Sequence, residues 1–178
     1  MSVKSELRKA LIAKRKSVEN KEQKDREICR RLTELEEYKN AKTVLLYAAL
    51  PDEVNCDEVI SAALSEGKKV ALPKCLDKNG HMKYYFITST ADLKAGSFSL
   101  REPDESCKEV TDFSSSICVV PAVCFDKKNY RLGYGGGYYD RFLKNFFYIS
   151  VGLCYNELIQ ENLPADEYDI PVSLVITD

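Results

Sequence analysis

A strand–helix–strand pattern in the first half of the chain constrains its fold more than any other feature. Thr43 to Tyr47 is a short, continuous apolar run of the kind found in strands that are buried on both faces. The segment from Asn55 to Glu66 is predicted to form a helix that Asn55 and Glu58 cap at its start, and Lys69 to Pro73 is predicted to form a second strand. Two strands joined by a helix indicate a parallel sheet with right-handed crossovers.

Apolar periodicity predicts the remaining elements around this unit. Residues 89–116 lack periodicity, so a long loop that covers a site is expected there. Helices are expected over residues 3–18, 21–37 and 138–145. Strands are expected over residues 82–88 at a sheet edge and over residues 117–120, 146–155 and 172–177, with a short turn or helix over 156–162. The predicted fold class is α/β, a single three-layer domain over residues 1–178 with a mainly parallel sheet flanked by helices.

The composition excludes several classes of protein. The chain has 178 residues with 26 basic and 28 acidic side chains, and its formal net charge of −2 gives no electrostatic footprint for nucleic acid. No apolar run approaches the ~20 residues that a membrane span needs, and the first residues are rich in Lys and Glu where a signal peptide would be apolar. We therefore expect a cytoplasmic protein without a nucleic-acid or membrane partner.

Cysteine and histidine offer no obvious chemistry. The seven cysteines form no Cys-x-x-Cys pair, and their odd number argues against a disulfide framework, so reduced thiols in or near the core are predicted. The single histidine, His81, follows Asn79-Gly80 in a predicted turn. This position favours a solvated side chain over a general base or a zinc ligand.

The segment from Arg131 to Arg141 is the strongest candidate for a binding site. It holds four of the chain's eight glycines, together with three tyrosines, two arginines and an aspartate. Glycine allows several backbone N–H groups to turn toward one point and to approach a ligand closely. The residues from Tyr138 onward can form a helix, and the unpaired N–H groups at a helix N-terminus favour an anion such as phosphate.

The alternative for this segment is an ordinary glycine-rich turn without a ligand, because short glycine patterns match many turns. The segment lacks the Lys-Ser/Thr pair that follows the last glycine of a Walker loop, and it does not fit a dinucleotide fingerprint. It therefore belongs to neither of these two common types of phosphate-binding loop.

Charged residues in two other segments are further candidates. Lys4, Arg8 and Arg15 lie on a line beside the apolar stripe of the first helix, so they point at the rim of whatever that helix packs on. An ordinary surface helix with long basic side chains explains the pattern equally well. Glu53 follows the first strand, where ligands bind in open α/β sheets, and the alternative is that Asp52 and Glu53 are solvated charges before a helix.

The segment from Arg131 to Arg141, with Val119 to Asp126 before it, closely resembles the signature of the 5-formyltetrahydrofolate cyclo-ligases, which are also called 5,10-methenyltetrahydrofolate synthetases. The resemblance extends to Lys4–Arg8, Pro51–Val54 and Asp166–Asp169, in the same order along nearly the whole chain. It implies a fold related to ribose-phosphate isomerase and the CoA transferases.

The resemblance also implies a reaction. ATP and Mg²⁺ would drive cyclisation of 5-formyltetrahydrofolate to 5,10-methenyltetrahydrofolate, with release of ADP and phosphate. Phosphorylation of the formyl oxygen would make it a leaving group that N10 can displace. The expected partners are these small molecules alone, and the protein is expected to be a monomer.

Site residues follow from the resemblance position by position. Residues with a catalytic role would be Arg131, Tyr138 and Asp140. ATP would contact Lys4, Arg8, Arg131, Leu132, Gly133, Tyr134, Gly135, Gly136, Gly137, Tyr138 and Tyr139. The folate would contact Ala48, Glu53, Tyr134, Gly135, Gly136, Gly137 and Tyr138, and the metal would be bound by Asp140 and Asp169.

The chain departs from the family pattern at three positions. Family members often have Lys or Arg inside the glycine loop, where this chain has Tyr134 and Gly136, so charge compensation must come from flanking groups. Many bacterial members have His before the residue that matches Asp169, where this chain has Tyr168.

Two other functional classes stay open at this level. A CoA transferase-like enzyme could use Glu53 as its nucleophile, although it would not need an aspartate for Mg²⁺ beside the glycine loop. A catalytically silent folate- or nucleotide-binding protein would keep the loop and lack turnover.

Overall fold

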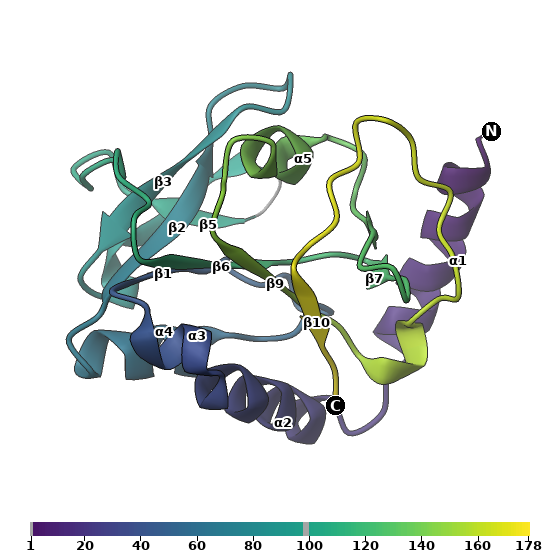
Figure 1. The fold of residues 1–178 in the computed structure, drawn as a ribbon, viewed down its shortest axis with the longest axis horizontal. Coiled ribbons are helices and arrows are strands. Elements are labelled where there is room, and N and C mark those ends of the chain that lie inside the picture. The colour runs from purple at the N-terminus through teal and green to yellow at the C-terminus, as the bar shows by residue number, and fades with distance from the viewer. Residues whose placement is uncertain (1, 98–99) are drawn as a thin grey trace.

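The computed structural model describes residues 2–97 and 100–178 and centres on a six-stranded sheet with strand order β10-β9-β6-β1-β2-β3 (Figure 1). The strands are β1 (Thr43–Leu45), β2 (Lys69–Cys75), β3 (Met82–Ile87), β6 (Ser116–Val120), β9 (Ile149–Leu153) and β10 (Leu174–Ile176). All neighbouring pairs are parallel except β2 and β3, which are antiparallel, so β3 is an antiparallel edge strand. The predicted mainly parallel sheet is confirmed.

Helices lie on both sides of this sheet. They are α1 (Val3–Lys16), α2 (Lys21–Glu34), α3 (Glu36–Asn40), α4 (Asp57–Ser65) and α5 (Tyr138–Leu143). In Figure 1, α2, α3 and α4 lie below the sheet, α5 lies above it, and α1 stands beyond its right-hand end. The predicted three-layer arrangement is therefore confirmed. None of the helices in the described residues is long and apolar enough to cross a membrane.

Two local predictions about helix ends are wrong. The helix expected over residues 21–37 is interrupted at Leu35, whose backbone is extended with φ −61° and ψ 137°, so that α2 and α3 are separate. Cys56, not Asn55, is the N-cap residue of α4. The Asn55 side chain instead accepts a hydrogen bond from the N–H of Asp57 at 2.9 Å, which satisfies a donor of the first turn from one position further out.

The region predicted as a long loop contains short elements. A 3-10 helix, η1 (Thr90–Asp92), precedes the antiparallel pair β4 (Leu93–Ala95) and β5 (Arg101–Pro103). Residues 98–99 of the predicted loop lie outside the described residues. Buried Glu102 of β5 accepts a hydrogen bond from the N–H of Cys75 at 3.1 Å, which attaches this pair to the end of β2. Three-residue strands are too short to show a period, which explains the difference.

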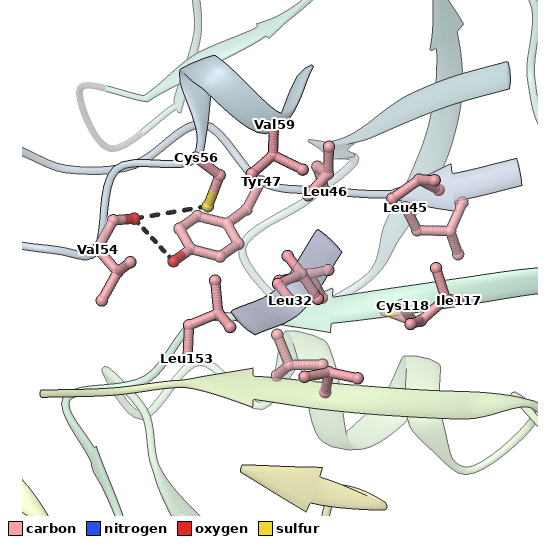
Figure 2. Close-up of a cluster of buried hydrophobic side chains, with 14 of the residues drawn as sticks. Leu32, Leu45, Leu46, Tyr47, Val54, Cys56, Val59, Ile117, Cys118 and Leu153 are labelled. Atoms are coloured by element: carbon pink, nitrogen blue, oxygen red, sulfur yellow. Dashed lines mark hydrogen bonds between the residues drawn. The ribbon is translucent and has the colours of Figure 1, made fainter. Parts of the chain in front are cut away.

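The core extends past the end of β1 and shapes the loop that follows it. The Tyr47 hydroxyl and the Cys56 thiol both donate hydrogen bonds to the carbonyl of Val54, at 2.9 and 3.5 Å (Figure 2). Tyr47, Val54 and Cys56 are all buried. These bonds close the loop on itself and leave residues 48–53 in a fixed path at the carboxyl end of the sheet.

The topology places a ligand crevice at that end. The chain leaves β1 toward β2 on one side and leaves β6 toward β9 on the other, although β1 and β6 are neighbours. The loops after β1 and β6 therefore diverge, and in open α/β sheets ligands bind between such loops.

Gly152 of β9 provides a test of packing in this sheet. A Cβ on Gly152 would lie 2.3 Å from Cζ of Phe125, whose ring is fully buried. We expect Gly152→Ala to lower the free energy of unfolding by about 1–3 kcal/mol through overpacking, as measured by urea denaturation. In a Phe125→Leu background the same substitution should cost less, because the smaller side chain leaves room for the methyl group. An equal cost in both backgrounds would show that the ring is not the obstacle.

Candidate active site

A β-hairpin carries the glycine loop to the crevice. It pairs β7 (Cys124–Phe125) with β8 (Arg131–Leu132) directly after β6. Asp126 stabilises the turn, because its Oδ1 accepts hydrogen bonds from the N–H groups of Lys128 and Tyr130, both at 2.9 Å. Residues 133–137 consequently start beside the end of β6.

The conformation of the loop requires glycine at two positions. Gly135 has φ +96° and Gly137, the N-cap of α5, has φ +70°, which are left-handed conformations that favour glycine. Among the described residues, the N–H groups of residues 133–137 donate no hydrogen bond within the protein. These donors remain available to a ligand that accepts hydrogen bonds.

The turn between β2 and β3 supports the loop from one side, a contact that sequence reasoning missed. The Tyr138 hydroxyl donates to the carbonyl of Asp77 at 2.6 Å, and Arg141 donates to the carbonyl of Gly136 at 3.0 Å. A Cβ on Gly80 would lie 2.3 Å from that same carbonyl, so only glycine allows the turn to approach so closely. No local pattern connects residue 80 with residue 136.

Two basic residues of α1 face the loop and the segment near the C-terminus. Arg8 Nε donates to the carbonyl of Gly133 at 2.6 Å. Lys4 Nζ lies 2.8 Å from Asp166 Oδ2 and 2.6 Å from Asp169 Oδ2. Burial lowers the pKa of Lys4, but the hydrogen bonds to Asp166 and Asp169 outweigh it, and the net shift is upward. Lys4 and Arg8 thus lie one turn apart and hold two different segments.

Arg131 and Asp140 form an ion pair within the predicted site. Arg131 Nη2 lies 2.6 Å from Asp140 Oδ1, and the Arg131 side chain is only 5% exposed. Both residues also bind the backbone of Ile170. Arg131 Nη1 donates to the carbonyl of Ile170 at 2.7 Å, and the N–H of Ile170 donates to Asp140 Oδ1 at 3.1 Å. The structure therefore brings Asp140 next to the segment that carries Asp169.

The carboxylates near the glycine loop are too few to bind a magnesium ion by themselves. In the part of the chain that the structure describes, no group of three or more His, Cys, Asp or Glu side chains could hold a metal. Mg²⁺ is commonly bound through one or two carboxylates together with phosphate oxygens. Asp140 and Asp169 are two carboxylates on adjacent segments, which is the number that an ion shared with a phosphate requires, and they do not form a cage that binds Mg²⁺ alone.

Glu53 lies in the loop that the core closes after β1. Its Oε2 accepts a hydrogen bond from the N–H of Leu50 at 2.9 Å, and the residue is buried. Burial raises the pKa of the Glu53 carboxyl above its usual value, although the hydrogen bond from Leu50 and the charge of Arg15 act in the opposite direction. Ala48, the other folate residue expected in this loop, is also buried.

Arg15 and Asp52 lie beside these residues, although the resemblance assigned a ligand to neither of them. The Arg15 side chain is 2% exposed, and its Nη2 lies 2.8 Å from Asp52 Oδ2. It also donates to the hydroxyl of Tyr134 in the glycine loop. The signal that points to Arg15 in the sequence is its place beside the apolar stripe of α1, on the same line as Lys4 and Arg8.

The other predicted residues differ in how they can meet a ligand. Tyr134 is half-exposed, whereas Leu132 is buried and the Tyr139 hydroxyl is buried near Tyr84 and Cys118, so these two can offer a ligand only their backbone. His81 is exposed and lies 2.7 Å from Asp77 in its turn, in agreement with the prediction. All seven cysteines are free thiols, as predicted.

Comparisons with known proteins relate this chain to one family. A family model described as the 5-formyltetrahydrofolate cyclo-ligase family matches residues 1–178. The chain is 31% identical over 166 residues to a probable 5-formyltetrahydrofolate cyclo-ligase of Schizosaccharomyces pombe, covering 84% of this chain and 81% of that protein. It is 31% identical over 156 residues to the 5-formyltetrahydrofolate cyclo-ligase of Haemophilus influenzae, covering 84% and 83%.

A solved structure gives the same relation. The NMR structure of Aquifex aeolicus 5,10-methenyltetrahydrofolate synthetase superimposes with a TM-score of 0.86 at 35% sequence identity, covering 99% of this chain and 90% of that one.

The raised pKa of Glu53 predicts a pH-dependent effect on stability. A carboxyl group that holds its proton more tightly in the folded protein than in the unfolded chain destabilises the fold as it ionises. We therefore expect Glu53→Gln to gain free energy of unfolding relative to the wild type as the pH rises from about 4 toward neutrality. Urea denaturation over this range measures the difference, and Glu105→Gln, at an exposed position, controls for the loss of one negative charge. A difference that stays constant with pH would contradict the prediction.

Proposed function

Because this chain belongs to the 5-formyltetrahydrofolate cyclo-ligase family, we propose that it converts 5-formyltetrahydrofolate and ATP into 5,10-methenyltetrahydrofolate, ADP and phosphate, with Mg²⁺. The observation that carries the proposal is the set of unpaired N–H groups at residues 133–137, with Arg8, Arg131 and Asp140 around them. This combination suits a phosphorylated ligand.

The reaction needs activation of a poor leaving group. The formyl oxygen attacks the γ-phosphorus of ATP, the bond to the β-phosphate oxygen breaks, and ADP leaves. The phosphorylated formyl group is then an iminium phosphate, and the lone pair of N10 attacks its carbon. N10 loses its proton and the carbon–oxygen bond breaks, so phosphate departs and the methenyl bridge remains.

The glycine loop would hold the transferred phosphoryl group through its backbone donors. Such donors are fixed in direction before the ligand arrives, so they stabilise developing charge without reorganisation. Arg8 and Lys4 would approach the phosphates from α1, and Arg131 would approach from the loop itself. Each of these cations is held in place by a carbonyl or a carboxylate in the structure.

Asp140 and Asp169 would hold Mg²⁺ together with phosphate oxygens. The ion would supply positive charge that neutralises those oxygens during transfer. Asp140 is tied to Arg131 and to Ile170, which orients its carboxylate toward the same segment as Asp169. Asp166 pairs with Lys4 and would remain outside the metal site.

The folate would lie between the loop after β1 and the glycine loop. Glu53 would accept hydrogen bonds from N–H groups of the pterin, and Ala48 would line the same pocket. Tyr134 and Tyr138 would pack against the pterin or the formyl group. We further propose that residues 1–178 act as one monomeric domain in the cytoplasm, without nucleic-acid or membrane partners.

The CoA transferase-like alternative is weaker. A nucleophilic Glu53 would explain a buried carboxylate but would leave the glycine loop and the pair Asp140 and Asp169 without a task. A silent binding protein would explain the loop but would show no turnover.

The test is the appearance of the methenyl absorbance when the purified protein, 5-formyltetrahydrofolate, ATP and MgCl₂ are mixed. We expect one ADP for each methenyl product, no product without ATP, and strongly reduced turnover in Asp140→Asn, which weakens charge stabilisation by several kcal/mol. Binding of both ligands without product would favour the silent protein. Transfer of CoA without ATP would favour the transferase.

The ion pair between Lys4 and Asp169 predicts how metal and nucleotide affect each other. Asp169→Asn removes a carboxylate that competes with phosphate for Lys4, so ATP should bind about fivefold more tightly in EDTA, which corresponds to about 1 kcal/mol. In excess Mg²⁺ the same variant should bind ATP more weakly than the wild type. Isothermal titration calorimetry measures both affinities.

Asp166→Asn is the matched control for this experiment. Asp166 contacts Lys4 from the same segment but has no proposed contact with the metal. This variant should also bind metal-free ATP more tightly and should keep the wild-type gain from Mg²⁺. If Asp169→Asn and Asp166→Asn respond alike to Mg²⁺, then Asp169 is not a metal ligand.

A further inference from the structure

We propose that Arg15 is a positioning residue that couples the loop after β1 to the glycine loop and so sets the distance between the folate and phosphate subsites. The inference rests on the proposed function, because that function assigns the folate to Glu53 and the phosphates to residues 133–137.

The contacts of Arg15 join four parts of the chain. From α1, its Nε and Nη2 donate to Asp52 Oδ2 at 3.0 and 2.8 Å, and its Nη1 donates to the carbonyl of Ala122 at 2.9 Å. Asp52 lies in the loop after β1, and Ala122 lies just after β6. The remaining contact of Nη2 is with the hydroxyl of Tyr134. The two diverging loops of the crevice are thus held by one planar group.

Tyr134 is held in place by this arginine. Its hydroxyl accepts the hydrogen bond from Nη2, which places the Arg15 guanidinium carbon 5.6 Å from the centroid of the ring. The tyrosine as a whole is half-exposed, so part of its surface stays open to a ligand. Arg15 therefore orients a side chain that would pack against the folate.

The charge of the group also reaches Glu53. Nη1 of Arg15 lies 3.9 Å from Glu53 Oε1, beyond hydrogen-bond distance but close enough for a strong electrostatic interaction in a buried site. Oε2 of Glu53 is already bound to the N–H of Leu50, so Oε1 is the oxygen that can accept from the folate. Arg15 thus acts on two of the proposed folate contacts, Glu53 and Tyr134, without touching the folate.

A purely structural role explains these contacts less well. The loop after β1 is already closed by the hydrogen bonds of Tyr47 and Cys56 to Val54, and β1 pairs with β6 along its whole length. A stabilising ion pair between Arg15 and Asp52 would not need a half-exposed tyrosine of the ligand loop as a further partner. The geometry points to coordination of the two loops.

Lysine is the informative replacement because it keeps the charge and loses the fork. A lysine ammonium is a point charge on a flexible stem and cannot bind Asp52, Ala122 and Tyr134 in one plane. We expect Arg15→Lys to lower kcat by tenfold or more, to weaken 5-formyltetrahydrofolate binding, and to leave the affinity for ATP alone within about threefold. Arg30→Lys, at an exposed arginine paired with Glu27 and Glu34, should change none of these values.

The decisive measurement is a double-mutant cycle with Tyr134→Phe. If Arg15 acts through the tyrosine hydroxyl, the loss in Arg15→Lys with Tyr134→Phe should be smaller than the product of the two single losses, in kcat and in the calorimetric Kd for 5-formyltetrahydrofolate. A structural role would leave the two changes independent. Since Arg15 is buried, a variant that fails to fold is replaced by Asp52→Asn, which keeps the side-chain shape and removes the ionic partner of the guanidinium.

The outcomes separate this inference from the proposed function. Turnover by the wild type with independent effects of the two substitutions, or a loss of stability with unchanged kcat per folded molecule, would overturn the positioning role alone. If the wild type binds 5-formyltetrahydrofolate but forms no product, the cycle in Kd still decides the role of Arg15. A wild type that does not bind the folate would overturn both.

Discussion

The parallel pairing of β1 with β6 is the constraint on which the site depends. After β1 the chain turns toward β2, and after β6 it turns toward β9 on the other side, so the two loops diverge. Side chains from another element connect these loops. The helix α1 stands across this end of the sheet in Figure 1 and supplies those side chains. Arg8 reaches the glycine loop, Lys4 reaches Asp166 and Asp169, and Arg15 reaches both diverging loops.

Opposite charges around the crevice neutralise one another in this structure. Lys4 pairs with Asp169, Arg131 with Asp140, and Arg15 with Asp52, each through contacts of 2.6 to 2.8 Å. Buried or half-buried charges need such partners, and the pairs keep the site ordered. A phosphate that binds Lys4 or Arg131 would free the carboxylate paired with that residue to bind a cation. A cation that binds the carboxylate would in turn free Lys4 or Arg131 to bind phosphate. Nucleotide and metal should therefore assist each other's binding.

The sequence predicted the elements better than the contacts between them. Apolar periodicity predicted the long helices and the buried strands, and the glycine content of residues 133–137 predicted the loop, because these signals are local in the sequence. The β4–β5 pair was too short to show a period. Gly80 supports the loop at Gly136, which lies 56 positions further along the chain, and Arg15 contacts Tyr134, which lies 119 positions further along. No local pattern in the sequence encodes contacts over such separations. The sequence allows Arg15 to be either a residue at the rim of a site or an ordinary cation on a surface helix, and its burial in the structure excludes the second.

Positions 134 and 136 of the glycine loop carry no basic residue, but α1 places a basic residue beside the loop. Arg8 is bonded to the carbonyl of Gly133, and a Cβ on Gly135 would lie 3.5 Å from its Nη2, so its guanidinium lies directly beside the loop. Positive charge is thus supplied to the loop from another element of the chain. Its position depends on how α1 is docked, and Arg15 extends from that same helix to Asp52 in the loop after β1. Under the proposed function the phosphate and folate subsites would consequently share one scaffold, and α1 would be the element through which they affect each other.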